Sequence, residues 1–205
     1  MFTLPEFFVL SFLIGLTGAL VPGPTLVATI NESLKSGWTA GPRVTSGHIA
    51  IEFAIAIAVI FGMSAALSEY TSEIAVAGGA VLIIFGLMNI LSSRNIKIGR
   101  SGSGQAGTAP FLAGIITSAT NPYFWIWWLT TGAGFLLEGL KGGIIFAAAF
   151  MIGHWFSDLG WFTFVSTGVS KGKNVMPERM YRGVIFACGI FLIGFGLWFI
   201  SGTLG

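Results

Sequence analysis

The segment "GALVPGPTLVATI", residues 18–30, is apolar enough for the middle of a membrane, yet Pro22, Gly23 and Pro24 interrupt it. Proline lacks an amide hydrogen and clashes with the carbonyl group four residues earlier, so two prolines together should break a helix rather than merely bend it. In hydrocarbon, the backbone groups that such a break frees are tolerated only where they face protein or a water-filled cavity. The segment therefore predicts a membrane helix that is broken beside a pathway.

The composition of the whole chain agrees with a membrane location. Of 205 residues, 54% are apolar and 9% are charged, whereas soluble domains carry roughly a quarter charged residues. A soluble protein of this length could not bury so much apolar surface, which indicates an integral membrane protein surrounded by the lipid bilayer. The single cysteine, Cys188, excludes an intrachain disulfide framework.

Six apolar segments are long enough to cross a bilayer as helices: 6–30, 43–66, 73–92, 110–136, 143–167 and 182–202. The Gly/Ser-rich stretch "SGSGQAGT" separates the third from the fourth and predicts a flexible linker. We therefore expect an all-α membrane protein with one transmembrane domain over residues 1–205. It would consist of a first repeat at 1–92, a linker at 93–109 and a second repeat at 110–205.

Lysine and arginine side chains predict the orientation of these segments. They are concentrated in or beside the first, third and fifth connections, and only Lys141 falls on the opposite side. The positive-inside rule places those three connections in the cytoplasm and both termini outside. The net charge of +2 is explained by this topology, so no nucleic-acid partner is expected.

A short motif occurs once in each half of the chain. "SGHIAIEF" contains Gly47, His48 and Glu52, and "IGHWFSDL" contains Gly-His followed by Asp158 at the same spacing. A histidine and an acid four positions apart share a helix face and can touch. Because each half has three spans, the second half would enter the membrane from the opposite side. Such an inverted repeat is typical of secondary transporters whose binding site lies between the repeats.

The second half has a break of its own, Asn121-Pro122, at the position that corresponds to the first. The half-helix after each break would present amide donors and the positive end of its dipole, which suits a carboxylate or another anion. Asn121 is a candidate cap for the second half-helix. The alternative is a pair of kinks that serve helix packing alone.

The two acids of the repeated motif lie inside otherwise apolar spans, where a charged side chain costs about 2.5 to 3.5 kcal/mol on insertion scales. Such residues are candidates for function. His48 and His154 could exchange protons with Glu52 and Asp158, which would couple transport to protons. The same four side chains could instead bind zinc or a similar divalent ion if they converge, or hold helices together by hydrogen bonds.

The aromatic run "YFWIWW", residues 123–128, follows the second break near the middle of its span. Trp and Tyr usually mark the membrane interface. At this depth, ordinary packing is the interpretation we favour, and the alternative is that some rings line the cavity or stack on a substrate ammonium group.

Taken together, these motifs resemble the LysE family of amino-acid exporters. The family has a Pro-Gly-Pro type motif in its first helix, a glycine-rich second helix with an intramembrane acid, and an Asn-Pro motif in its fourth. The matching residues here are Pro22, Gly23, Pro24, Gly41, Gly47, Glu52, Asn121 and Pro122. The resemblance implies a six-helix carrier of the inner membrane, often a dimer, that exports amino acids or related metabolites using an ion gradient. Tyr123 stands where many members have lysine, and the wider superfamily includes exporters of cadmium and other cations.

From the sequence we expect a secondary exporter of a small zwitterionic metabolite, most simply an amino acid. Its carboxylate would lie at the breaks, near Pro22, Gly23, Pro24, Asn121 and Pro122, and its ammonium group or a proton would bind Glu52 and Asp158. His48 and His154 would tune these acids or relay protons. The alternative cargo is a divalent cation bound by the same two histidines and two acids. No enzyme is expected and no cofactor, since the chain carries no zinc-protease motif, nucleophile constellation or cofactor fingerprint.

Overall fold

The computed structural model of the chain describes residues 2–21, 23–62, 70–95, 109–172 and 177–202. Most of these residues are helical, and none of them is in a strand. In chain order the helices are α1 (Leu4–Ala19), α2 (Pro24–Ser36), α3 (Ala40–Ile60), α5 (Thr71–Asn95), α6 (Ala109–Ala119), α7 (Pro122–Trp127), the π-helix η1 (Trp128–Gly132), α8 (Ala133–Lys141), α9 (Ile144–Gly172) and α10 (Glu178–Gly202). The expected all-α class is confirmed.

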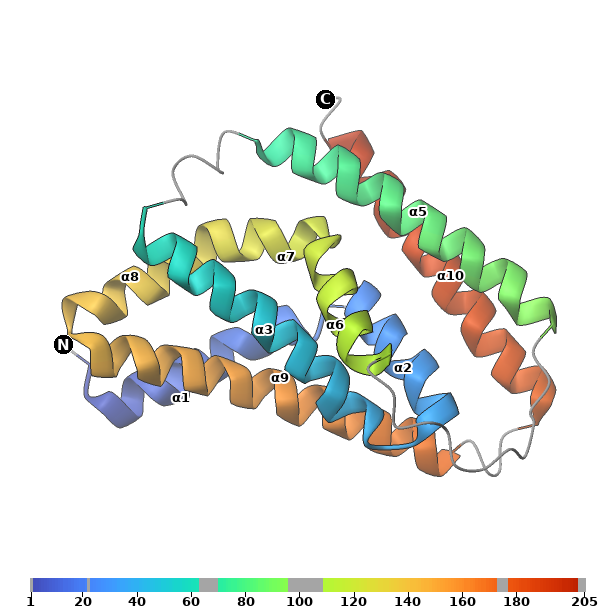
Figure 1. Cartoon of the computed structure of the whole chain (residues 1–205), viewed down its shortest axis with the longest axis horizontal. Coiled ribbons are helices and arrows are strands. Elements are labelled where there is room, and N and C mark those ends of the chain that lie inside the picture. Colours follow the sequence, from blue (N-terminus) through green and yellow to red (C-terminus); the bar gives the residue numbers. More distant parts are fainter. Residues whose placement is uncertain (1, 22, 63–69, 96–108, 173–176, 203–205) are drawn as a thin grey trace.

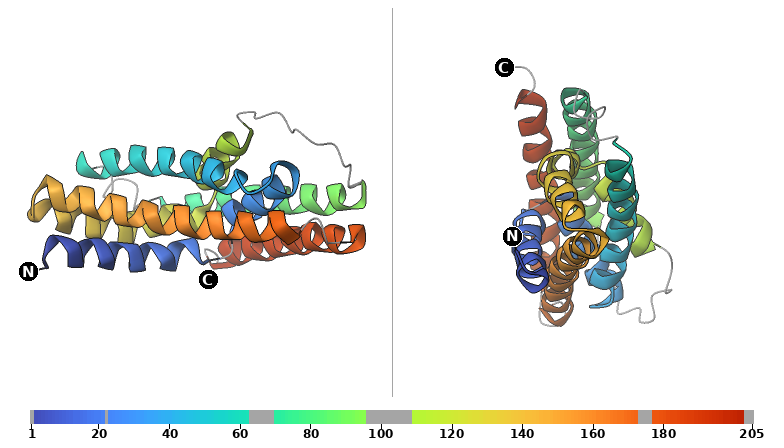
Figure 2. Two further views of the ribbon diagram at one scale, coloured as in Figure 1. Left: turned by 90° about the horizontal axis from the view of Figure 1, so that it is seen from below. Right: turned by 90° about the vertical axis from the view of Figure 1, so that its left-hand side faces the viewer.

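The helices form two groups (Figure 1). α5 and α10 pack mainly against each other and lie side by side, whereas α1 to α3, α6, α7, η1, α8 and α9 form the larger group. Figure 2 shows that the molecule is elongated along its long helices. The larger group has a core of aromatic and aliphatic side chains around Trp128 and Phe150, and a smaller core around Leu82 and Leu192 joins α2, α5 and α10.

The six expected spans are not all present as long apolar helices. Among the described residues, three helices are long and apolar enough to cross a membrane: Ala40–Ile60, Ile144–Gly172 and Ile185–Gly202. The pair α1 and α2 makes a fourth if it counts as one bent span. The expected span 110–136 is divided between α6, α7, η1 and α8, and its first division falls at the break that Asn121-Pro122 predicted. The chain is thus a multi-pass membrane protein with three or four candidate spans.

The first break lies between α1, which ends at Ala19, and α2, which begins at Pro24. The axes of the two helices are bent by 80°. Gly23 is the N-cap of α2, and Pro24 occupies the first helical position, where a missing amide hydrogen costs nothing. Pro22 lies outside the described residues.

The second break separates α6, which ends at Ala119, from α7, which begins at Pro122. The Asn121 side chain accepts a hydrogen bond from the Tyr123 amide at 3.1 Å, so Asn121 caps the helix as expected. From Pro122 the chain stays helical through α7, η1 and α8 to Lys141.

The first helix of each half packs against the second helix of the other half. α1 contacts α9, and α6 contacts α3. At these contacts Gly47 of α3 lies against the Phe111 carbonyl of α6, and Gly153 of α9 lies against the Phe8 carbonyl of α1. A Cβ atom at either glycine would overlap that carbonyl, so the glycines permit the close approach.

A second repeat joins the remaining helix pair, and the sequence analysis missed it. Residues 79–90 of α5 and 189–200 of α10 share the pattern Gly-x-x-Leu-Ile-x-Phe-Gly-Leu-x-x-Ile. The glycines of this pattern contact one another across the pair: Gly79 lies against the Gly196 carbonyl, Gly86 lies against the Gly189 carbonyl, and each contact is reciprocated. The pattern explains why α5 and α10 pack so closely.

Candidate functional site

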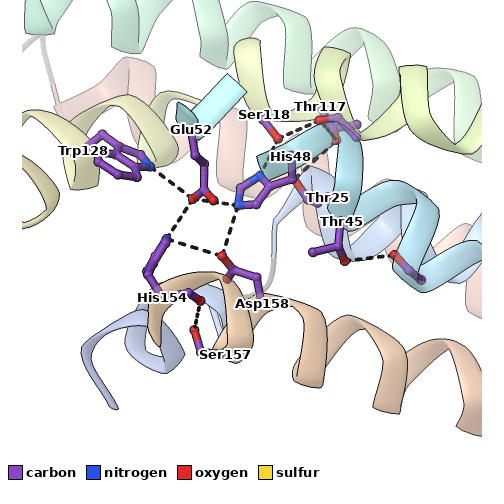
Figure 3. A network of polar contacts seen from close by, with 12 residues as sticks. Thr25, Thr45, His48, Glu52, Thr117, Ser118, Trp128, His154, Ser157 and Asp158 are labelled. Atoms are coloured by element: carbon purple, nitrogen blue, oxygen red, sulfur yellow. Dashed lines mark hydrogen bonds and ion pairs between the residues drawn. The ribbon is translucent and has the colours of Figure 1, made fainter. Parts of the chain in front are cut away.

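Four buried side chains meet between α3 and α9: His48, Glu52, His154 and Asp158 (Figure 3). We call them the His–acid cluster. His154 Nε2 lies 2.8 Å from Glu52 Oε1 and 3.4 Å from Asp158 Oδ2. His48 Nε2 lies 3.2 Å from the same Glu52 oxygen and 3.8 Å from the same Asp158 oxygen. Histidine and acid therefore alternate around a closed four-membered arrangement.

The helical spacing predicted half of these contacts. His48 with Glu52 and His154 with Asp158 are the expected pairs four residues apart. The contacts between the pairs depend on how closely α3 approaches α9. Gly41 lies against the Phe162 carbonyl of α9, and a side chain there would hold the two helices apart.

Ser118 fixes the orientation of the His48 ring. Its hydroxyl donates to the Gly114 carbonyl at 2.6 Å, and its oxygen lies 2.6 Å from His48 Nδ1. Because the hydroxyl hydrogen is used, His48 Nδ1 must carry the hydrogen that joins the two groups. Neutral His48 consequently presents the lone pair of Nε2 to Glu52 and Asp158, where it can take up a proton or a cation.

His154 is held by aromatic rings instead. The Trp127 ring is stacked on it with 4.7 Å between ring centroids, and the Trp128 ring meets it edge to face at 5.7 Å. Its Nδ1 atom is buried and has no hydrogen-bond partner among the described residues. Gly15 of α1 lies beside that atom. The two histidines of the repeated motif thus have different environments.

Trp128 also binds the cluster directly. Its indole Nε1 donates to Glu52 Oε1 at 3.2 Å, and its side chain is fully buried. Trp128 is the first residue of η1, and π-helical turns inside α-helices occur frequently at functional sites. The aromatic run read from the sequence mainly as packing therefore also supplies a hydrogen-bond donor and the ring stacked on His154.

A small inner cavity joins the cluster to both helix breaks. Its volume is about 50 Å³, and the residues that line it include Gly23, Asn121, Thr25, Tyr123 and all four members of the cluster. The breaks meet there, because a Cβ atom on Gly23 would lie 3.5 Å from Asn121 Nδ2. Pro24 and Pro122 are buried and begin the two helices without lining the cavity. A space of this volume is large enough for one or two water molecules, a carboxylate group or a small cation.

Three polar atoms of the cluster have no hydrogen-bond partner among the described residues: Glu52 Oε2, Asp158 Oδ2 and His154 Nδ1. A buried polar atom without a partner is costly, which points to a bound group. The two oxygens are acceptors for a proton, an ammonium group or a metal ion. One ligand atom each from His48, Glu52 and Asp158 lies within 4.8 Å of the others, so a single cation could contact all three.

Sequence reasoning did not find several residues that shape this site. Ser118 and Thr25 are small hydroxyl residues without any motif, although each lies within three positions of a break. That proximity to a break was the one feature of the sequence that could have indicated a role for these two residues in the site. Their partners, His48 and Thr117, are far away in the sequence.

Buried acids and histidines that share one cavity with two helix breaks, in a chain with several membrane-crossing helices, define the class of this protein as a membrane transporter. The chain belongs to the LysE family, because the family model described as LysE type translocator matches residues 16–203. It is also 24% identical over 199 residues to "Putative amino acid efflux protein YcgF" of Bacillus subtilis (strain 168), with 93% of each chain covered. None of the solved structures matches the chain. The family predicted from the motifs is confirmed.

Proposed function

We propose that this protein is a secondary exporter of a small zwitterionic metabolite, most simply an amino acid. The observation that carries the proposal is the meeting of the His–acid cluster with both helix breaks in one cavity. Membership in the LysE family and the similarity to a protein named for amino acid efflux support the class of substrate.

In this proposal the substrate binds by its two charged ends. Its carboxylate lies at the N-terminus of α2, where Thr25 and Leu26 line the inner cavity and the first amides of the helix have no intrahelical partner. The Asn121 side-chain amide, beside Gly23, donates to the same carboxylate. Its ammonium group binds Glu52 Oε2 and Asp158 Oδ2, which accept no hydrogen bond from the described residues.

After the substrate has been released, a proton takes the place of its ammonium group while the empty carrier returns. Neutral His48 presents a lone pair to both acids, so a proton held between them neutralises the cluster after the ammonium group has left. His154, which bridges the same acids, relays or stabilises that proton. Substrate and proton then compete for one site, which is the requirement for exchange across the membrane.

Alternating access by two inverted repeats is the proposed movement. The crosswise packing of α1 on α9 and of α6 on α3 supports it, as does the reciprocal glycine pattern of α5 and α10. The proposed repeats are residues 1–92 and 110–205 of one transporter domain in the cytoplasmic membrane, with both termini outside. A homodimer is part of the proposal through family resemblance alone.

The proposal is tested by exchange of labelled amino acids in proteoliposomes. Glu52→Gln and Asp158→Asn should each reduce exchange at least tenfold, because each removes a charge that faces the substrate ammonium group. Glu138→Gln is a matched control, since that acid is exposed and pairs with Lys141 at the end of α8. If both cluster variants are folded and exchange amino acids at the wild-type rate, the mechanism is wrong.

A divalent cation is a second candidate cargo, favoured by the convergence of His48, Glu52 and Asp158. Imidazole and carboxylate ligands suit zinc and similar ions. Metal analysis of the purified protein with zinc and with cadmium separates the two cargoes. Stoichiometric metal that is lost in His48→Ala would favour the cation, and stabilisation by amino acids without metal binding would exclude it.

A further inference from the structure

Three hydroxyl residues of α2 recur at a spacing of four. Thr25, Thr29 and Ser33 are buried and share one face of the helix. The Thr29 hydroxyl donates to the Thr25 carbonyl at 2.9 Å, and the Ser33 hydroxyl donates to the Thr29 carbonyl. The carbonyl that would serve Thr25 in the same way belongs to Val21, which lies in the break between α1 and α2. Within the described residues, Thr25 donates to no carbonyl group, so the break leaves its hydroxyl without the bond that the other two make.

The only side chain among the described residues that holds the Thr25 hydroxyl is Thr117 of α6 (Figure 3). The Thr117 hydroxyl donates to the Ala113 carbonyl at 2.7 Å, and its oxygen lies 3.3 Å from the Thr25 oxygen. Because a hydroxyl group has one hydrogen and the shorter bond uses it, Thr25 must supply the hydrogen that lies between the two threonines. A separation of 3.3 Å is long for a bond between hydroxyl groups, so Thr117 is a weak acceptor.

Other hydrogen-bond donors meet the Thr25 hydroxyl at the inner cavity. The Val27 amide is the first to bond within α2, to the Gly23 carbonyl at 3.1 Å, so the preceding amides of Thr25 and Leu26 have no intrahelical partner. Both residues line the cavity, as does Asn121, which is 8% exposed. The Asn121 side chain accepts from the Tyr123 amide through its oxygen, and its Nδ2 atom donates to none of the residues that the structure describes. Such a group of N–H and O–H donors suits an anion.

A carboxylate oxygen is a better acceptor than Thr117 for the Thr25 hydrogen. Bonds from a hydroxyl group to an ionised carboxylate are about 2.5 to 2.7 Å long and roughly twice as strong as bonds between neutral groups. The inner cavity, with a volume of about 50 Å³, is large enough for a carboxylate group. A carboxylate that enters the cavity would therefore take the Thr25 hydrogen from Thr117.

We infer that Thr25 is a further substrate-binding residue, whose hydroxyl donates to the substrate carboxylate and donates to Thr117 when no substrate is bound. This inference rests on the proposed function and deepens it by naming a side chain that selects for a carboxylate on the substrate. A divalent cation has no acceptor for the hydroxyl hydrogen, so Thr25 favours a carboxylate-bearing substrate over the alternative cargo.

The test is amino-acid exchange by variants of Thr25 in proteoliposomes. Each of the standard amino acids is first supplied in labelled form to the wild-type protein, and the one that is exchanged fastest becomes the probe. Thr25→Val should raise the KM for this probe about tenfold, because a hydrogen bond to a charged group is lost. The maximal rate should change less than about twofold, since the His–acid cluster is intact. Thr25→Ser keeps the hydroxyl group and should restore the KM.

Two controls separate substrate binding from a general effect on α2. Thr29→Val removes a buried hydroxyl one turn further along the helix, outside the inner cavity, and should leave the KM within about twofold of the wild type. The carboxamide of the probe is then tested as a competitor. Its neutral oxygen gains less from the hydroxyl group, so Thr25→Val should weaken its inhibition less than about threefold. A distorted helix would weaken the binding of both compounds equally.

The outcomes distinguish this inference from the function on which it rests. Exchange that responds to Glu52→Gln, with an unchanged KM in folded Thr25→Val, would overturn the role of Thr25 alone. Equal increases of KM in Thr25→Val and Thr29→Val, or equal losses for the probe and its carboxamide, would do the same. Absence of any amino-acid exchange by the wild-type protein would overturn the proposed function itself.

Discussion

Removing the Ser118 hydroxyl should destabilise the protein specifically through His48. In Ser118→Ala the buried His48 Nδ1–H loses its acceptor at 2.6 Å, in a site where Ser118 is fully buried and His48 is 9% exposed. Hydrogen bonds between membrane helices average about 0.6 kcal/mol in double-mutant cycles and reach about 1.7 kcal/mol. Because this bond is short and withdrawn from water, we expect a loss of about 1 kcal/mol of unfolding free energy.

A double-mutant cycle measures this bond directly. Unfolding free energies in mixed micelles are compared for the wild type, Ser118→Ala, His48→Phe and the double variant, so that the coupling energy isolates the pair. Ser201→Ala is the matched control, since that hydroxyl is exposed and bonds only to the preceding turn of α10. A coupling energy below about 0.3 kcal/mol would refute the reasoning, and with it the conclusion that Ser118 fixes the His48 tautomer.

Three further predictions concern the elements around the site. Gly47→Val should prevent stable folding, because the valine side chain would overlap a carbonyl of α6, whereas Gly134→Ala should fold, because a Cβ atom there meets nothing. Gel filtration tests this, and a monodisperse Gly47→Val protein would contradict the packing. Asn121→Ala should lower the unfolding free energy by about 1 kcal/mol, because the helix cap is lost, whereas Asn121→Asp should keep most of that free energy. Equilibrium unfolding measures both variants, and equal losses would exclude the cap. Trp128→Phe should keep the buried ring but remove the donor to Glu52, reducing exchange about tenfold at nearly unchanged expression, and wild-type exchange rates would show that the indole N–H is dispensable.

The sequence was most informative where local rules decide the structure. Proline and asparagine chemistry predicted where α2 and α7 begin, and helical periodicity predicted the His48–Glu52 contact. These features depend on residues within four positions of one another. The fold class could likewise be predicted from the composition, because composition does not depend on which residues are in contact.

The sequence was least informative where distant residues meet. Contact between Glu52 and His154 requires the packing of α3 on α9, which no spacing within one helix encodes. The indole of Trp128 reaches Glu52 across 76 positions of sequence. The number of spans also depends on how broken and short apolar helices are counted, and three or four of the helices among the described residues are long and apolar enough to cross a membrane. Six spans therefore stay a prediction.

The different neighbours of the two histidines make the symmetry of the site incomplete. Ser118 contacts Nδ1 of His48, whereas Gly15 lies beside Nδ1 of His154 and lets α1 approach α9 more closely. With Glu52 ionised, His154 already donates from Nε2, so its free nitrogen faces away from the acids, while the free nitrogen of His48 faces them. The two halves, whose helices follow nearly the same pattern, therefore present the acids with two chemically different histidines, and the difference comes from one serine and one glycine rather than from the arrangement of the helices.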